Sequence, residues 1–207
     1  MSLFDSTQLM TNLDAVNYIL ISNGHTPVTT LDNPNRGLRT VISFLASADL
    51  ELQTRAWSWN TIEEWEAVPD ANNEIALPDN ITSLSVSPLA IRSFGRRPRN
   101  IAIRRRNGKP FLFNARTGEF EFEQKLFLRI SQRLDFQDIP TAARQYTAAQ
   151  AANRYNSAHI NDPMVRQTQL ERIAEARALI EQQEDDHTFN NAHHDQLTNS
   201  LGRNNGA

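Results

Sequence analysis

A chain of 207 residues, with 39% hydrophobic residues and a formal net charge of −3, suits one domain or two small ones. It contains no cysteine, which excludes a disulfide framework, a thiol nucleophile and a Cys-ligated zinc site. No apolar run approaches the length of a membrane span, and the first residues lack the basic region of a signal peptide. Together these features favour a protein made in a cytoplasm.

Charge is strongly segregated along the chain. Residues 1–79 hold 11 acids and 3 bases, residues 80–118 hold 9 bases and no acid, and residues 119–207 hold 13 acids and 9 bases. The local electrostatic field influences the choice of partner more than the total charge does, so the basic segment 80–118 is the most informative feature of the sequence. Its arginine block consists of Arg92, Arg96, Arg97, Arg99, Arg104, Arg105 and Arg106.

Three interpretations of the arginine block are open: an interface with an acidic protein surface, a nucleic-acid-binding site, or a solvated hairpin face. The acidic segments on both sides favour the protein interface. Strand alternation predicts Arg104 and Arg106 on one face and Arg105 on the other. The candidate interface residues in this block are Arg96, Arg97, Arg99, Arg104, Arg105 and Arg106.

Two amphipathic helices are predicted before residue 60. The first follows Thr11, which forms a capping box with Asp14, and it stops before Gly24. The second begins at Pro34, with Asp32 or Asn33 as its cap. Its apolar stripe consists of Leu38, Val41, Ile42, Leu45 and Leu52.

Between about residues 61 and 135 the apolar period changes from helical to alternating. Asn107-Gly108 lies between two alternating runs, which is the strongest short-range signal of a β-hairpin. A second turn at 116–118 precedes the alternating segment 119–123, and a further strand is expected over 125–134. These patterns predict an antiparallel β region.

Two helices are predicted after the β region. An Ala-rich helix follows Pro140, and a second helix begins at Pro163, capped by Asp162, and ends near Asp185. The apolar stripe of the second helix is thin, so we expect it to serve assembly more than subunit folding. Its candidate interface residues are Leu170, Ile173, Arg177 and Ile180.

The predicted fold is therefore α+β. Residues 1–60 and 136–186 are expected to form an antiparallel helical bundle domain, and residues 61–135 an inserted antiparallel β domain. Residues 187–207, rich in Asn and His, are expected to form a flexible tail.

Motifs for catalysis, cofactor binding or metal binding are lacking in the sequence. Glu63, Glu64 and Glu66 suit a solvated strand face better than an acid/base pair, because neighbouring strand residues point apart. A His pair beside one acid in the expected tail is a weak metal signal; these residues are His193, His194 and Asp195. We therefore expect no catalytic residue, no metal and no cofactor.

Three tryptophans lie close together in an acidic segment: Trp57, Trp59 and Trp65. Such a group can form a stacking platform for bases or sugars. Packing at the junction of the helical and β regions is favoured instead, because the acidic surroundings would repel a nucleic acid.

Two sequence blocks resemble the tail tubular protein A family, the head-to-tail adaptors of short-tailed bacteriophages. The first is DAVNYILISNG over 14–24 with TPVTTL over 26–31, and the second is LELQTRAWSWN over 50–60. The family's usual residues are replaced by Asn23, Ala56 and Trp59. The matching residues, expected to build the subunit, are Ala15, Val16, Asn17, Leu20, Gly24, Pro27, Val28, Leu31, Gln53, Arg55, Trp57 and Asn60.

The resemblance implies a structural virion protein without catalytic residues. It implies a dodecameric ring between the portal and a nozzle resembling tail tubular protein B, with double-stranded DNA passing through the bore. Other copies of the chain are partners, a tail fibre is a further candidate partner, and no membrane is involved. The helical part would face the portal and neighbouring copies, and the β part the nozzle.

Two other functions stay open beside the adaptor. One is a nucleic-acid-binding virion accessory protein that uses the Arg92–Arg106 block. The other is a virion-associated hydrolase with Glu63 or Glu66 as its acid.

Overall fold

A computed structural model describes residues 10–87 and 100–203, with side chains described as far as Asp186. The chain divides into two compact units, one formed by Met1–Asp49 with Phe136–Ala207 and the other by Leu50–Asp135. The α-helices lie in the first unit, apart from the last residues of the helix Arg36–Gln53, and the described strands lie in the second together with a short 3₁₀ helix, Ser58–Asn60. The expected α+β class is therefore confirmed. The predicted domain limits and the antiparallel order of a bundle stay predictions.

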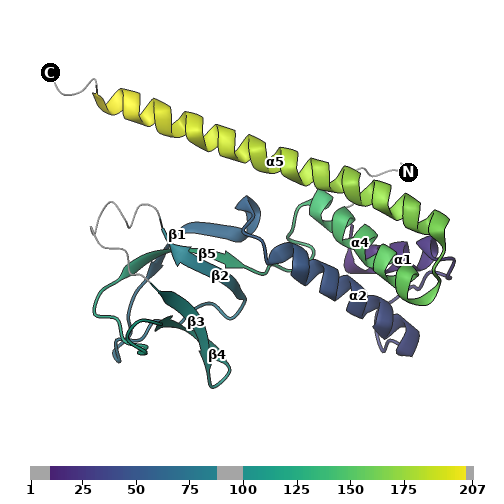
Figure 1. Cartoon of the computed structure of the whole chain (residues 1–207), viewed down its shortest axis with the longest axis horizontal. Helices are drawn as coiled ribbons and strands as arrows, with labels where there is room; N and C mark the ends of the chain where they lie inside the picture. Colours follow the sequence, from purple (N-terminus) through teal and green to yellow (C-terminus); the bar gives the residue numbers. More distant parts are fainter. Residues whose placement is uncertain (1–9, 88–99, 204–207) are drawn as a thin grey trace. The chain divides into compact units, whose positions relative to one another are not determined.

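The helical unit is built around α4 (Thr141–His159), which contacts both α1 (Asn12–Ser22) and α5 (Pro163–Arg203). In Figure 1, α5 runs along α4, and α1 also lies beside α4. The remaining helix, α2 (Arg36–Gln53), places Phe44 edge-on to Tyr155 of α4. Small residues allow close approach to α4: the alanines at 142, 143, 148, 149, 151 and 152 are all buried.

The predicted signals at the helix starts are largely confirmed. Thr11 and Asp14 form the expected capping box of α1. Asp162 accepts hydrogen bonds from the backbone N–H groups of Met164 (2.8 Å) and Val165 (3.3 Å) at the start of α5. The start of α2 was predicted wrongly: it begins at Arg36, and the side chain of Asn35 accepts the Leu38 N–H bond at 2.8 Å. Asn35 takes the capping role because it directly precedes the first helical residue.

Helix α5 is longer than predicted, since its backbone continues past Asp185 to Arg203. Gln169, Ala176 and Ile180 are buried along it, and Ile173 is half-buried. These positions are three or four residues apart, so they share one face of the helix. This face belongs to the core of the helical unit, so α5 also serves the fold of the subunit, and its role in assembly stays a prediction. The expected flexibility of residues 187–207 stays a prediction.

The β unit contains a three-stranded antiparallel sheet with strand order β1-β5-β2, formed by β1 (Thr61–Ala67), β2 (Ile81–Val86) and β5 (Leu126–Gln132). A second, two-stranded sheet pairs β3 (Ile101–Arg106) with β4 (Lys109–Asn114). The core of the unit consists of Ala67, Ile75, Leu77, Ile81, Leu112, Leu128 and Ile130.

The predicted hairpin is confirmed at Asn107-Gly108. Both residues have positive φ, 52° and 81°, and they join Arg106 to its cross-strand partner Lys109. The alternating segment 119–123 does not form a strand. It makes isolated bridges instead, Glu119 with Asn114 and Glu121 with Glu74.

Candidate functional site

The first family-like motif closes the turn after α1. Ala15, Val16 and Leu20 are buried, and Gly24 has φ of 76°, which favours glycine at this helix end. Asn17 then holds the following link through two hydrogen bonds: its Nδ2 donates to the Val28 carbonyl (2.9 Å) and its Oδ1 accepts from the Val28 N–H (2.8 Å). In the same link, Pro27 is exposed and Leu31 half-buried. The motif therefore fixes the direction of the chain as it leaves α1.

The second motif forms a hydrogen-bonded corner between α2 and β1. The indole Nε1 of buried Trp57 donates to the Leu52 carbonyl at 2.9 Å, and the Trp57 N–H donates to Oδ1 of Asn60 at 2.9 Å. Asn60 Nδ2 donates to the carbonyls of Gln53 and Arg55, both at 3.1 Å. These bonds satisfy the polar groups that the turn would otherwise leave unpaired.

Gln53 ties the same corner to the end of the sheet. Its Nε2 donates to the Leu134 carbonyl at 3.0 Å, and its Oε1 accepts from the Leu134 N–H at 2.7 Å. Trp57 stacks on Trp59 with an interplanar angle of 10°, and Trp65 packs against the core of the β unit. All three tryptophans thus have packing partners within the β unit.

The arginine block divides into residues with distinct contacts. The guanidinium of Arg104 lies 3.7 Å from the Phe113 ring centroid. Arg106 lies over the rings of Phe111 and Phe120, at 4.8 and 5.1 Å, and forms an ion pair with Glu74. Arg104 and Arg106 therefore share one face of β3, as alternation predicts.

Arg105 points elsewhere and donates to two backbone carbonyls, those of Gly108 (3.1 Å) and Asp79 (3.4 Å). The hydrogen bonds from Arg106 lower the pKa of Glu74 and raise the pKa of Arg106. Arg92, Arg96, Arg97 and Arg99 lie outside the described residues.

The four candidate residues on α5 have different surroundings. Ile180 is 3% exposed and belongs to the core, Ile173 is half-buried, and Leu170 is 47% exposed. Arg177 forms the predicted pair with Glu181 at 2.7 Å, which raises the pKa of Arg177. Only Leu170 and Arg177 therefore lie on open surface.

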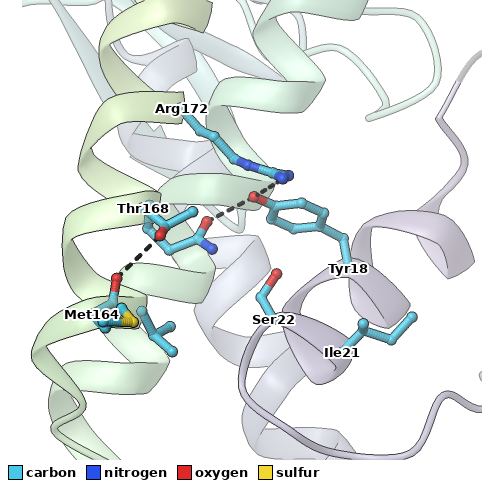
Figure 2. Close-up of a pocket in the computed structure, with 8 residues that line it drawn as sticks. Tyr18, Ile21, Ser22, Met164, Thr168 and Arg172 are labelled. Atoms are coloured by element: carbon cyan, nitrogen blue, oxygen red, sulfur yellow. Dashed lines mark hydrogen bonds between the residues drawn. The ribbon is translucent and has the colours of Figure 1, made fainter.

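A groove of about 410 Å³ lies between α1 and the first turns of α5 (Figure 2). One end is apolar, where Ile21 is 59% and Met164 78% exposed. At the other end Arg172 donates to the Tyr18 hydroxyl at 3.1 Å, and this hydroxyl donates to Oε1 of Gln169 at 2.7 Å. The remaining lining residues are Ser22, Val165 and Thr168.

The acidic residues considered for catalysis do not converge. Glu63 pairs with Arg129 at 3.0 Å and Glu66 with Lys125 at 2.7 Å, both at the surface. Glu64 is exposed in the irregular stretch of β1 between Ile62 and Trp65. Among the residues with described side chains, no three metal-ligating groups lie together. The side chains of His193, His194 and Asp195 lie outside those residues.

The model of a family described as tail tubular protein matches residues 13–189, most of the chain. The chain belongs to the tail tubular protein family. No curated protein matches the sequence. The family match confirms the resemblance that the two motifs indicate, and it covers both units.

Tail tubular proteins are structural components of the phage virion tail, and the family is not an enzyme family. Membership of this family indicates assembly with other tail or portal components and with further copies of the same chain. In the described part of the chain, every helix is too short or too polar to cross a membrane.

Sequence reasoning missed the groove of this tail tubular protein. Tyr18 lies on α1 and Arg172 on α5, 154 positions apart in the sequence. Neither residue lies in a motif with known chemistry. The only available signal was an aromatic residue within a family-like helix.

Proposed function

We propose that the chain is a head-to-tail adaptor, which forms a dodecameric ring between the portal and the tail nozzle and lets the genome pass through its bore. The observation that carries this proposal is membership of the tail tubular protein family over residues 13–189. The two motifs add support, because they resemble those of the head-to-tail adaptors of short-tailed bacteriophages. The protein is made in the host cytoplasm and acts in the virion tail.

The proposed domain roles are those that the resemblance to tail tubular protein A implies. The helical domain, residues 1–60 and 136–186, docks on the portal and on neighbouring copies, and the β domain, residues 61–135, faces the nozzle. A tail fibre is a further proposed partner of the assembled ring. Residues 187–207 act as a flexible tail.

The described arginines of the block are proposed to contact protein and not to line the DNA channel. Arg105 and Arg106 are engaged within the chain, whereas Arg104 is exposed, lies over the Phe113 ring and forms no ion pair with a described residue. Each phosphate contact adds about 0.9 to the dependence of log affinity on log salt. A ring of such contacts would retain a genome that has to slide.

The test is stepwise assembly of the full chain with purified portal, followed by addition of nozzle protein. Mass photometry and electron microscopy should find a closed ring of adaptor copies on each portal. Arg104→Glu should leave portal docking intact and prevent nozzle addition or ring closure, whereas the control Arg116→Glu should assemble normally. A chain that never joins the portal would refute the adaptor proposal.

A nucleic-acid-binding accessory protein is the second candidate function, since the arginine block lies in a segment, residues 80–118, that contains no acidic residue. It predicts DNA affinity that falls steeply with salt and falls further in Arg104→Glu. Normal assembly of Arg104→Glu with altered DNA retention would favour this candidate.

A further inference from the structure

The groove between α1 and α5 contains a cation that forms no ion pair with a described carboxylate. Arg172 is the charged residue among those that line it, and no carboxylate in the described part of the chain pairs with it. One N–H group of Arg172 donates to Tyr18, and its guanidinium lies 5.4 Å from the Tyr18 ring centroid. The other N–H groups make no hydrogen bond to described residues.

The orientation of Arg172 is set before any partner arrives. The Tyr18 hydroxyl accepts from Arg172 and donates to Gln169, which is 3% exposed, so this chain of hydrogen bonds ends in the core of the unit. Figure 2 shows Tyr18 and Arg172 pointing toward one another across the groove. A guanidinium held in this way loses little freedom when it binds a carboxylate through two N–H groups.

The opposite end of the groove is suited to an apolar side chain. Ile21 and Met164 are the two most exposed large hydrophobic residues of α1 and α5 among those described, and they face the same groove. A volume of about 410 Å³ holds a few side chains, and falls within the usual range of binding pockets. The lining therefore selects a short segment with a large apolar residue beside a carboxylate.

We infer that this groove receives such a segment from a second copy of the chain. Charge complementarity supports this occupant, because residues 1–79 hold 11 acids against 3 bases. Of these acids, Asp32, Glu64 and Asp79 are exposed and form no ion pair with a described residue, so each copy carries acidic surface as well as the groove. A contact between two different surfaces repeats from copy to copy and produces a closed ring when its rotation closes. The inference rests on the proposed self-assembly and assigns to it one contact site.

The test uses the full chain with p-benzoylphenylalanine in place of Met164, exposed to ultraviolet light. A covalent product of twice the chain mass is expected. The matched control places the same photoreactive residue at Glu175, which is also exposed on α5 but does not line the groove, and should give little of this product.

Two substitutions test the chemistry of the two ends. Arg172→Glu should weaken self-association at least about tenfold, because it replaces a charge-assisted contact with repulsion. Met164→Glu should also weaken self-association, and because Met164 is 78% exposed, this substitution should leave folding intact. Ala178→Glu, at an exposed position of the same helix outside the groove, should associate like the wild type.

The outcomes separate the inference from the proposed function. If the wild type self-associates and both groove variants do so equally well, or if Met164 cross-links only to portal, the inference is overturned and the adaptor ring stands. If the wild type stays monomeric even on the portal, the ring itself is refuted, and the inference with it.

Discussion

Arg106 and Glu74 form an ion pair across the β unit, and the same guanidinium lies between the rings of Phe111 and Phe120. The hydrogen bonds from Arg106 hold the pKa of Glu74 below its ordinary value. A residue of the arginine block therefore serves the fold of its own chain.

The Glu74 pair predicts a dependence of stability on pH. A carboxyl whose folded pKa is lowered contributes stability above its unfolded pKa, about 4.3, and loses it as the pH falls through the folded pKa. The melting temperature of the wild type should fall in this acidic window, and Glu74→Gln should show a smaller fall. Glu119→Gln, an exposed control, should follow the wild type; identical pH profiles for Glu74→Gln and the wild type would contradict the prediction.

Trp57→Ala should strongly lower the thermal stability of the β unit. The substitution removes a buried indole and its 2.9 Å hydrogen bond to Leu52, and loss of a buried aromatic residue costs about 3–5 kcal/mol. Differential scanning calorimetry of the full chain measures the effect, with Trp59→Ala as a half-buried comparison. An unchanged melting temperature with loss of assembly would instead assign Trp57 to an interface.

Asn17 provides a test of the first motif. Asn17→Ala removes both hydrogen bonds to Val28 and should cost about 1–3 kcal/mol, because it leaves two backbone groups without partners. Asn17→Asp retains an acceptor but loses the donor to the Val28 carbonyl, so it should not restore stability. Chemical denaturation can compare both with Asn12→Ala, an exposed position at the start of α1. Equal stability of Asn17→Ala and Asn12→Ala would disprove the structural role of the motif.

Local features of the fold could be predicted from the sequence because short-range chemistry determines them. The capping box at Thr11, the turn at Asn107-Gly108 and the pair Arg177–Glu181 each depend on residues within four positions. The start of α2 was missed, because several residues could serve as its cap. The bridges of segment 119–123 depend on distant partners, and an alternating pattern alone does not reveal them.

The candidate surfaces were less predictable for the same reason. The sequence indicates a basic block, but it cannot show that Arg106 finds Glu74, 32 positions earlier, or that Arg104 stacks on Phe113. The stripe of α5 was predicted only in part: Ile173 and Ile180 lie on the buried face, but Gln169 and Ala176 accompany them there, whereas Leu170 and Arg177 are exposed. Which face of a polar helix is buried depends on the helices it contacts, and in this chain α4 provides that surface.

The buried face of α5 leads to a prediction about where the chain tolerates truncation. A chain ending after Asn161 loses Gln169, Ala176 and Ile180, which are all buried, and uncovers the small-residue surface of α4. We expect this truncation to melt at a markedly lower temperature than the full chain, or to lack a cooperative transition. A chain ending after Asp186 keeps all three residues and should melt like the full chain. Circular dichroism at 222 nm measures both, and portal binding by the longer truncation then tests whether 187–207 serve assembly. A stable, cooperative chain ending after Asn161 would show that α5 is dispensable for the helical unit and would restore the interpretation of this helix as an assembly element.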